Sequence, residues 1–298
     1  MADERDAHYL HEKKGLSAVP TPSIERPRAI GWVGMSEKLL VATEAHGVVE
    51  LDPIMGMREL DAPVSDPAEL AVSPDGRLFF VVERGRGVSV RHTRDGSEVG
   101  SASIALLSDI AACWFPLSAT EAGIAVAGDD LDGRKVILLN AECSRRRVAK
   151  LPPRTAIGAG RTAGLLCARV TEGGLVVTQF GKPIGEEPPS KHRLRFSASG
   201  ILLGIADGGV TVWRGPKDAP HTFPTYDVSA AAVNGSGSLV AIGTRTGDVA
   251  LTSIEQGNFQ RARPGRVGAH LGAVRTMSFS PKGRWLATAA DELRLWSW

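Results

Sequence analysis

The feature that most constrains the fold of this chain is a repeat of about forty residues. Each copy has three short apolar stretches, separated first by a Ser, Pro or Gly turn and then by a Gly or Asp turn. The clearest copy spans residues 270–298. Two further clear copies begin at Leu70 and Leu194, and weaker ones at Ile30, Ala112, Ala231 and Ile157, the last assigned largely from its position. Marker residues near the first stretches are 37 to 46 residues apart, which predicts seven copies of one supersecondary unit.

The composition favours an all-β globular chain. The 298 residues include 34 Gly and 18 Pro, and both types break helices and mark turns, so a helix bundle is disfavoured. A hydrophobic share of 43% excludes disorder, and no run of 18 apolar residues could cross a bilayer. The formal net charge of +2 gives no global attraction to nucleic acid.

Cysteine usage and the N-terminal residues bear on the compartment. Cys113, Cys143 and Cys167 are too few and too far apart for a disulfide framework, and none belongs to a C-x-x-C pair typical of zinc sites. The first residues, MADERDAHYLHEKK, are charged throughout and lack the apolar core of a secretory signal. We therefore expect a cytoplasmic location.

The last copy of the repeat resembles a WD40 repeat. Residues 268–270 (Gly-Ala-His) stand near the Gly-His pair of that family, residues 279–283 form the first turn, and Asp291 lies at the second. Leu295 and Trp296 stand near the position of the Trp-Asp pair that ends a repeat in that family. Upstream the match is partial, because Trp213 is kept whereas the stretches 88–91 and 136–139 have no tryptophan. The resemblance covers nearly the whole chain after about residue 28 and implies an all-β, seven-bladed WD40-type β-propeller.

The resemblance also implies that each copy forms a four-stranded blade, which must stack on its neighbours to bury both faces. We expect blades near residues 28–62, 67–105, 109–152, 154–187, 191–224, 227–263 and 268–298. The last copy lacks the outermost strand that follows the third strand elsewhere, and an open edge invites aggregation. We predict that the N-terminal segment, residues 1–27, closes the ring with a strand between His8 and Ile24.

Four residues of the last copy match positions that form a buried hydrogen-bond network in WD40 repeats: His270, Thr288, Asp291 and Trp296. The resemblance implies a chain from carboxylate through imidazole and hydroxyl to the indole N–H, which satisfies polar groups that are costly to bury. The alternative is that His270 and Asp291 belong to a catalytic triad. Because no G-x-S-x-G elbow or other nucleophile context accompanies them, the structural interpretation is favoured.

Two short segments invite a cofactor interpretation. The stretch 129–133 offers three aspartates and a glycine, but Arg134 and Lys135 follow where a calcium loop needs further oxygen ligands, so an exposed Asp-Gly turn is favoured. The glycine-rich stretch 158–164 would cradle phosphate only before a helix, whereas residues 165–168 predict a strand. We expect no metal and no cofactor.

Arginines cluster at three places and could contact phosphate. The clusters are Arg145, Arg146 and Arg147; Arg261, Arg263 and Arg266; and Arg84 with Arg86. The near-neutral net charge and an aromatic content of 5%, with Phe259 the sole aromatic residue beside these arginines, oppose a nucleic-acid platform. A solvated rim is the favoured interpretation.

The resemblance places a candidate partner-binding face at the turns between second and third strands and the loops entering each first strand. These residues differ in charge and size, which favours a protein partner over a symmetric metal or sugar site. They are Glu44, His46, Arg84, Arg86, Asp129, Asp130, Arg245 and Asp291.

We therefore predict a non-catalytic scaffold or adaptor for one or more proteins, acting as a monomer or in a hetero-complex rather than as a homo-oligomer. One alternative is a propeller enzyme, such as a metal-assisted hydrolase or lactonase, with a site at the central channel; the mainly apolar and small residues of the first strands offer it few ligands. Another is a nucleic-acid platform built on the arginine clusters. A third is self-association, in which the N-terminal stretch closes a neighbour's ring.

Overall fold

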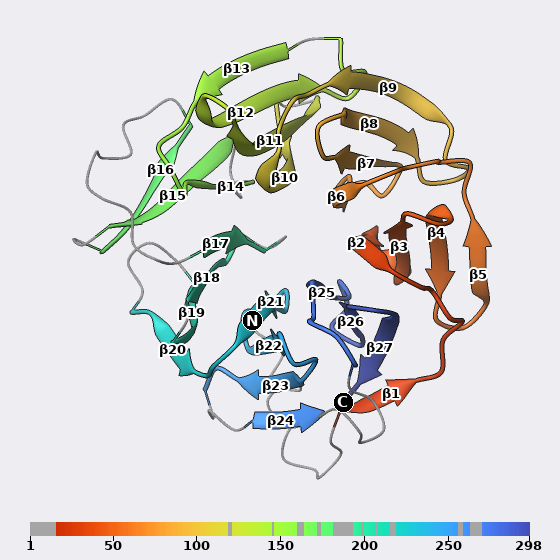
Figure 1. Cartoon of the computed structure of the whole chain (residues 1–298), viewed down its shortest axis with the longest axis vertical. Helices are drawn as coiled ribbons and strands as arrows, with labels where there is room; N and C mark the ends of the chain where they lie inside the picture. The colour runs from red at the N-terminus through yellow and green to blue at the C-terminus, as the bar shows by residue number, and fades with distance from the viewer. Residues whose placement is uncertain are drawn as a thin grey trace.

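The computed structural model describes most of the chain. The described residues are 16–118, 121–144, 146–159, 164–171, 174–180, 193–197, 200–206, 208–214, 219–255, 259–262 and 270–298. Their strands form seven sheets arranged around a common axis, each sheet being one blade (Figure 1). Within these ranges no helix is long and apolar enough to span a membrane. The predicted all-β, seven-bladed propeller is confirmed.

Blades 1 to 3 each have four described strands, with every neighbouring pair antiparallel and the first strand nearest the axis (Figure 1). Blade 1 contains β2 (Pro27–Val33), the 3-10 turn η1 (Gly34–Ser36), β3 (Lys38–Thr43), β4 (Gly47–Asp52) and β5 (Gly56–Glu59). Blade 2 contains β6 (Pro67–Val72), β7 (Leu78–Glu83), β8 (Gly87–His92) and β9 (Glu98–Ser103). Blade 3 contains β10 (Ser108–Pro116), β11 (Ala122–Asp130), β12 (Gly133–Asn140) and β13 (Arg146–Lys150).

The remaining blades follow the same order. Blade 4 has three described strands, β14 (Ala156–Ala159), β15 (Leu165–Thr171) and β16 (Gly174–Gln179); the outer strand expected before residue 187 lies largely outside the described residues. Blade 5 contains β17 (Arg193–Phe196), β18 (Leu202–Ala206), β19 (Gly209–Trp213) and β20 (His221–Pro224). Blade 6 contains β21 (Val228–Val233), β22 (Leu239–Thr244), β23 (Val249–Ser253) and β24 (Phe259–Ala262). Blade 7 contains β25 (Thr276–Phe279), β26 (Leu286–Ala289) and β27 (Leu293–Ser297).

The fourth strand of blade 7 is β1 (Ser17–Val19), which pairs antiparallel with β27 and lies on its outer side (Figure 1). The register sets Ala18 opposite Trp296. The connection from β1 to β2 is also attached to blade 7, because the Arg26 N–H donates to the Asp291 carbonyl at 2.9 Å. The prediction that an N-terminal strand closes the ring is confirmed.

The core is divided among the interfaces between blades. Seven clusters of buried apolar side chains occur among the described residues, and each joins two neighbouring blades. At the closing interface, Ile30 and Trp32 of blade 1 pack with Leu293 and Leu295 of blade 7. Because each sheet buries apolar side chains on both faces, a single blade could not hide its surface alone.

Tryptophans on two first strands fasten neighbouring blades together. The Trp114 indole N–H of blade 3 donates to the Ala71 carbonyl of blade 2 at 3.0 Å. The Trp32 indole N–H of blade 1 donates to the Ser278 carbonyl of blade 7 at 3.2 Å. Each indole thus buries a large apolar surface, while its N–H group has a hydrogen-bond acceptor.

Glycine begins the third strand at two places where the chain passes close to the end of the outer strand. Gly87 has φ 157° and Gly209 has φ 144°. A Cβ atom at either position would lie 2.2 Å from a carbonyl oxygen, that of Ala102 or Phe223 respectively. Glycine is therefore required by both backbone conformation and close approach, which explains the Gly-containing second turn of the repeat.

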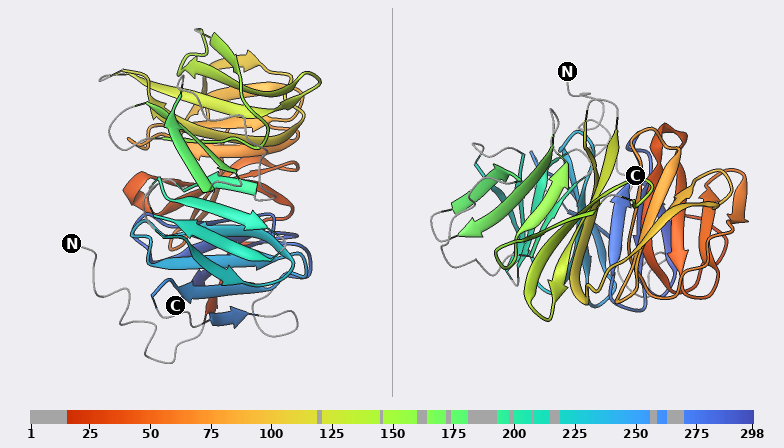
Figure 2. Two further views of the ribbon diagram at one scale, coloured as in Figure 1. Left: turned by 90° about the vertical axis from the view of Figure 1, so that its left-hand side faces the viewer. Right: turned by 90° about the horizontal axis from the view of Figure 1, so that it is seen from above.

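The strands run from one face of the ring to the other (Figure 2). One face carries the turns between second and third strands together with the connections that enter each first strand, and we call it the turn face. The opposite face carries the other two sets of turns, including the 3-10 turn Gly34–Ser36. The antiparallel order of the strands therefore collects segments from all seven blades on the turn face.

Candidate partner-binding face

The four network residues of blade 7 form a chain of successive polar contacts. The Trp296 indole N–H donates to the Thr288 hydroxyl at 2.8 Å, and that hydroxyl lies 2.7 Å from His270 Nε2. On the other side of the imidazole, Nδ1 is 3.6 Å from Asp291 Oδ1, an electrostatic contact longer than a hydrogen bond. Because the indole can only donate, the Thr288 oxygen accepts from it and donates to Nε2, which leaves the imidazole N–H on Nδ1, facing the carboxylate.

The environment of this network favours a structural role over catalysis. His270, Thr288 and Trp296 each have 0% of their surface exposed. Burial lowers the pKa of His270 to about 4, although the Asp291 charge opposes the shift. The imidazole is therefore neutral near pH 7. The Thr288 hydroxyl is occupied by the indole and shielded from solvent, so it is not positioned as a nucleophile.

The predicted face residues lie on the turn face at five blades. Most of them make an ion pair within their own blade. Arg84 pairs with Asp66 at 2.9 Å, and Arg245 lies 3.8 Å from Asp227; in both pairs the aspartate belongs to the connection that enters the first strand. Such exposed pairs contribute about 0–1 kcal/mol each to stability, so their main effect is to orient the turns.

The other members of the set have similar surroundings. Glu44 binds Arg28 at 2.7 Å, and the imidazole of His46 lies 3.4 Å from Glu59. Arg86 is exposed in the turn between β7 and β8. The structure thus places these turns on one face, whereas their role in partner binding stays a prediction.

The acidic stretch at the end of β11 has its carboxylates engaged by cations. Asp129 lies 3.2 Å from Arg134, and Lys135 pairs with both Asp130 and Asp132. The hydrogen bond from Lys135 holds the pKa of Asp130 below its usual range. Nowhere in the described part of the chain do three His, Cys, Asp or Glu side chains converge as metal ligands would.

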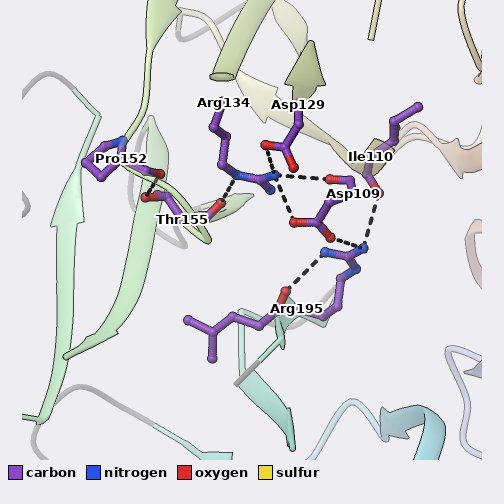
Figure 3. Close-up of polar contacts among 8 residues, drawn as sticks. Asp109, Ile110, Asp129, Arg134, Pro152, Thr155 and Arg195 are labelled. Carbon is purple, nitrogen blue, oxygen red and sulfur yellow. Dashed lines mark hydrogen bonds and ion pairs between the residues drawn. The ribbon is translucent and has the colours of Figure 1, made fainter. Parts of the chain in front are cut away.

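A polar network joins blades 3, 4 and 5 (Figure 3). Its centre is Arg134, whose side chain is 2% exposed. Its guanidinium group contacts Asp109 Oδ2 at 2.8 Å and donates to the Thr155 carbonyl of blade 4 at 2.8 Å. From blade 5, Arg195 reaches Asp109 Oδ1 at 3.4 Å and the Ile110 carbonyl at 3.2 Å. Asp109 is thus shared by two arginines from different blades.

Sequence reasoning missed this network because the first strands were expected to supply mainly apolar and small residues. In fact β6 carries Glu69, β10 carries Asp109 and Cys113, and β17 carries Arg193 and Arg195. Alternation along β17 provides a signal, since the two arginines flank a buried leucine and share one side of the strand.

Burial and neighbouring charges shift the pKa values of several side chains on these inner strands. Burial raises the pKa of Glu69 to about 7, although the charges of Arg195 and Arg193 oppose the shift. Partial desolvation, together with the Arg195 charge, lowers the pKa of Arg193, although its side chain is partly in contact with solvent. Burial also raises the pKa of the Cys113 thiol to about 12, so this thiol stays protonated at neutral pH.

Four large apolar side chains on the turn face are exposed, and the sequence analysis did not single them out. Leu107, Leu131, Tyr226 and Leu271 have 51%, 93%, 85% and 86% of their surface exposed. The Leu107 N–H donates to the Asp129 carbonyl at 2.9 Å, so Leu107 lies beside the end of the strand that leads to the turn with Leu131. The turn face therefore combines charged pairs with exposed apolar side chains.

The arginine clusters are only partly described. Arg146 donates to the Ser103 carbonyl at 3.2 Å, and the Arg147 guanidinium lies over the Phe180 ring, 5.8 Å from its centre. Arg145, Arg263 and Arg266 lie outside the described residues, as does the side chain of Arg261. The side chains of Arg146 and Arg147 thus have contacts within the protein.

No protein-family model matches this sequence, and a search of curated proteins gives no match. Among solved structures, the β-propeller domain of Cps50 (Swd1) from Myceliophteria thermophila is similar, with 16% sequence identity and a TM-score of 0.72. The match covers 95% of this chain and 100% of that chain. The fold is that of a seven-bladed β-propeller. At this identity the likeness concerns the fold alone, so the function of this propeller must be argued from its own surface.

Proposed function

We propose that this propeller is a non-catalytic scaffold that binds one or more partner proteins through its turn face. The observation that carries the proposal is the exposure of Leu107, Leu131, Tyr226 and Leu271 among ion-paired charges on that face. The opposite face also exposes apolar side chains, at Met35, Ile54, Met55 and Leu117, so a control variant on that face decides between the two. Exposed apolar side chains within a polar surround are typical of protein interaction sites. Charged pairs such as Arg84 with Asp66 would add specificity rather than much affinity.

The buried groups support a non-catalytic role. The hydroxyl of Thr288 and the imidazole of His270 serve each other and Trp296 inside blade 7. The raised pKa of Cys113 keeps its thiol from acting as a thiolate nucleophile. The alternative of a metal-assisted hydrolase gains no support from the ring axis, because Asp109 is held by two arginines.

A protein partner is also favoured over nucleic acid. The described arginines of the turn face include two whose charge is met by aspartates, Arg84 and Arg245. A strand-tracking groove would need unpaired cations with aromatic stacking platforms, and Arg147 stacks on the chain's own Phe180. We propose that the protein acts as a monomer or in a hetero-complex, because β1 completes blade 7 of its own chain. The cytoplasmic location stays a prediction from the sequence.

Affinity capture from the native cell, followed by mass spectrometry, tests this function. The wild-type protein should retain specific partners that are lost, at least tenfold, from an Arg84→Glu/Arg86→Glu variant and from a Leu131→Asp variant. A control is Arg77→Glu, which changes an exposed arginine that also lies near an aspartate, in the turn between the first and second strands of blade 2, on the opposite face. Capture that is unaltered by the first two variants but lost with the control would place the contact on the opposite face and contradict the proposal.

A further inference from the structure

The outer strand of blade 2, β9, differs from the outer strands of the other blades. Six blades have a described outer strand, and β9 is the longest of these, with six residues against three to five in the others. It lies at the rim of the ring, and no described strand pairs with its outer edge (Figure 1). Such an edge presents unpaired N–H and C=O groups, on which another strand can form.

The other outer strands have features that protect a sheet edge, namely charged side chains, proline or short length. β13 has three cations among its five residues, β5 has two charged residues among four, and β24 contains Arg261. β20 ends at a proline, and β1 has three residues. In β9 the sole charged residue is the first, Glu98, which pairs with Arg91 at 3.2 Å. The sequence of β9 after Glu98 therefore contains nothing that blocks a further strand.

The main-chain groups of Ser101 and Ser103 point away from the sheet. The Ile104 N–H donates inward, to the Arg86 carbonyl at 3.2 Å. Because the main-chain groups of successive residues in an antiparallel strand alternate in direction, those of Ser103 and Ser101 face outward. The Ser103 carbonyl agrees with this direction, since it accepts from the guanidinium group of Arg146 in the next blade at 3.2 Å.

The strand is held in place while its outer edge is accessible to solvent. Ser101 and Ser103 are both exposed. Blade 3 packs on one face of β9, because a Cβ atom at Gly100 would lie 2.3 Å from the Glu142 carbonyl oxygen. With β8 on its inner edge and blade 3 on this face, β9 needs little ordering to receive another strand, which favours affinity.

The end of β9 leads into the exposed apolar part of the turn face. Residues 104–107 connect β9 to β10, and Leu107 in this connection has 51% of its surface exposed. The Gly85 N–H donates to the Leu106 carbonyl at 2.9 Å, which fixes the connection beside the turn between β7 and β8. A chain bound along β9 would therefore reach the turn face at Leu107.

We propose that the outer edge of β9 accepts an extended segment of a partner protein as a fifth, antiparallel strand of blade 2. The inference rests on the proposed scaffold function, and it adds main-chain hydrogen bonds at the rim to the apolar contact at Leu107. Ser101 and Ser103 together offer two N–H donors and two carbonyl acceptors, which suits a segment of about four residues with high β propensity. In such strand addition the main-chain hydrogen bonds supply affinity, and the alternate side chains of the segment supply specificity.

Selection from a library of random dodecapeptides, displayed on phage and presented to the full chain, tests the proposal. N-methylation of the best peptide at successive positions should lower its affinity, measured by fluorescence anisotropy, at alternate positions, because every second N–H faces β9. Ser101→Pro should lower the affinity about tenfold or more, since it removes an outward N–H without breaking the pairing with β8. A matched control is Val148→Pro in β13, which faces outward because the Leu151 N–H donates inward to the Arg134 carbonyl. It should leave the affinity unchanged.

Other outcomes would overturn the proposal. Affinity losses that do not alternate along the peptide, or an affinity that Ser101→Pro does not change, would exclude the edge of β9. If binding is lost with Leu131→Asp but not with Ser101→Pro, or if a partner is captured while no peptide is enriched, the edge is wrong and the scaffold function stands; if neither is found, both fail. Dimerisation of the wild type that Ser101→Pro abolishes would make a second copy of the chain the occupant. Should Ser101→Pro fail to fold, Ser101→Lys gives the same test, because a charged side chain also blocks an edge.

Discussion

Blade 7 and blade 4 hold their places in the same ring by different means. Blade 7 has the clearest repeat, and the Trp296 indole N–H, the Thr288 hydroxyl and His270 Nε2 hydrogen-bond one another within the blade. Blade 4 has the weakest repeat and three described strands. Its polar anchoring comes from a neighbour, because Arg134 of blade 3 donates to the Thr155 carbonyl just before β14. A repeat that lacks the motif residues is thus supported by side chains of adjacent blades.

The two blades also differ in the contacts that they receive from other parts of the chain. Blade 7 is internally ordered but needs β1, a strand from the other end of the chain, to cover its outer edge. Blade 4 lies next to a cross-ring contact, in which Arg195 of blade 5 reaches Asp109 of blade 3. Motif residues therefore stabilise a blade, whereas the closure of the ring depends on segments outside the motif.

Of the changes that test the difference between the two blades, removal of β1 should lower the stability of the protein most. A variant without residues 1–20 loses the strand that pairs with β27, and it exposes a sheet edge together with part of the core around Trp296. We expect the melting temperature to fall by on the order of 10 °C, since a loss of several kcal/mol is spread over a chain of this size. Differential scanning calorimetry measures the change.

The matched control for this truncation deletes residues 2–12 and leaves β1 intact. Its melting temperature should stay close to that of the full chain. If both deletions have the same small effect, ring closure does not depend on the pairing of β1 with β27. Sedimentation of the longer truncation should also show association, because an unpaired edge strand recruits another chain.

The anchor of blade 4 is tested by Arg134→Leu. The side chain is 2% exposed and contacts Asp109, Asp129 and the Thr155 carbonyl, so its loss leaves these acceptors without their cation. We expect a destabilisation of about 3 kcal/mol, as is usual when one partner of a buried ion pair is removed. Denaturation by urea measures it, and hydrogen exchange should show faster opening of β14 than of β27.

An exposed ion pair provides the control for Arg134→Leu. Arg84→Leu breaks the pair with Asp66, in which both side chains are about half exposed, and should change stability by less than about 1 kcal/mol. Equal effects of the two substitutions would mean that Arg134 is no anchor. Faster exchange spread evenly over all blades would equally contradict the local role assigned to it.

The sequence predicted the architecture because the repeat is a property of local pattern. Alternation of apolar residues and the positions of turns identified seven blades, and the missing outer strand after Trp296 led to the closing strand at the N-terminus. Gly87 was visible as a turn residue, although the close approach to the Ala102 carbonyl that requires it was not. Such contacts join segments that only the folded ring brings together.

The candidate site was less accessible to sequence reasoning for the same reason. The network of His270 could be expected from the family resemblance, since its members occupy fixed motif positions. By contrast, Asp109 and Arg195 are 86 residues apart and belong to blades that are not adjacent. The contact of Arg146 with the Ser103 carbonyl likewise joins residues of different blades. The spacing of the repeat does not indicate which residues from distant segments come into contact.

The smallest predicted effect is a pH dependence confined to blade 7. The folded state holds His270 neutral, with a pKa of about 4, whereas an unfolded histidine titrates near 6.5. Between these values the unfolded chain binds more protons, so this contribution to stability is present above about pH 6.5 and is lost as the pH falls toward 4. The stability difference between wild type and a His270→Gln variant should thus shrink by roughly 2 kcal/mol between pH 7 and pH 4.5.

The comparison with His270→Gln is needed because Glu69 changes the stability with pH in the opposite direction. Its pKa is raised to about 7 by burial, in a site that faces Arg193, Arg195 and Cys113. The folded state then holds a proton that the unfolded state has released, so the contribution of Glu69 is lost as the pH rises through that range. Urea denaturation of both proteins at the two pH values cancels this term. A difference that stays constant would show that the imidazole is not held neutral, and the internal network would then no longer distinguish blade 7 from blade 4.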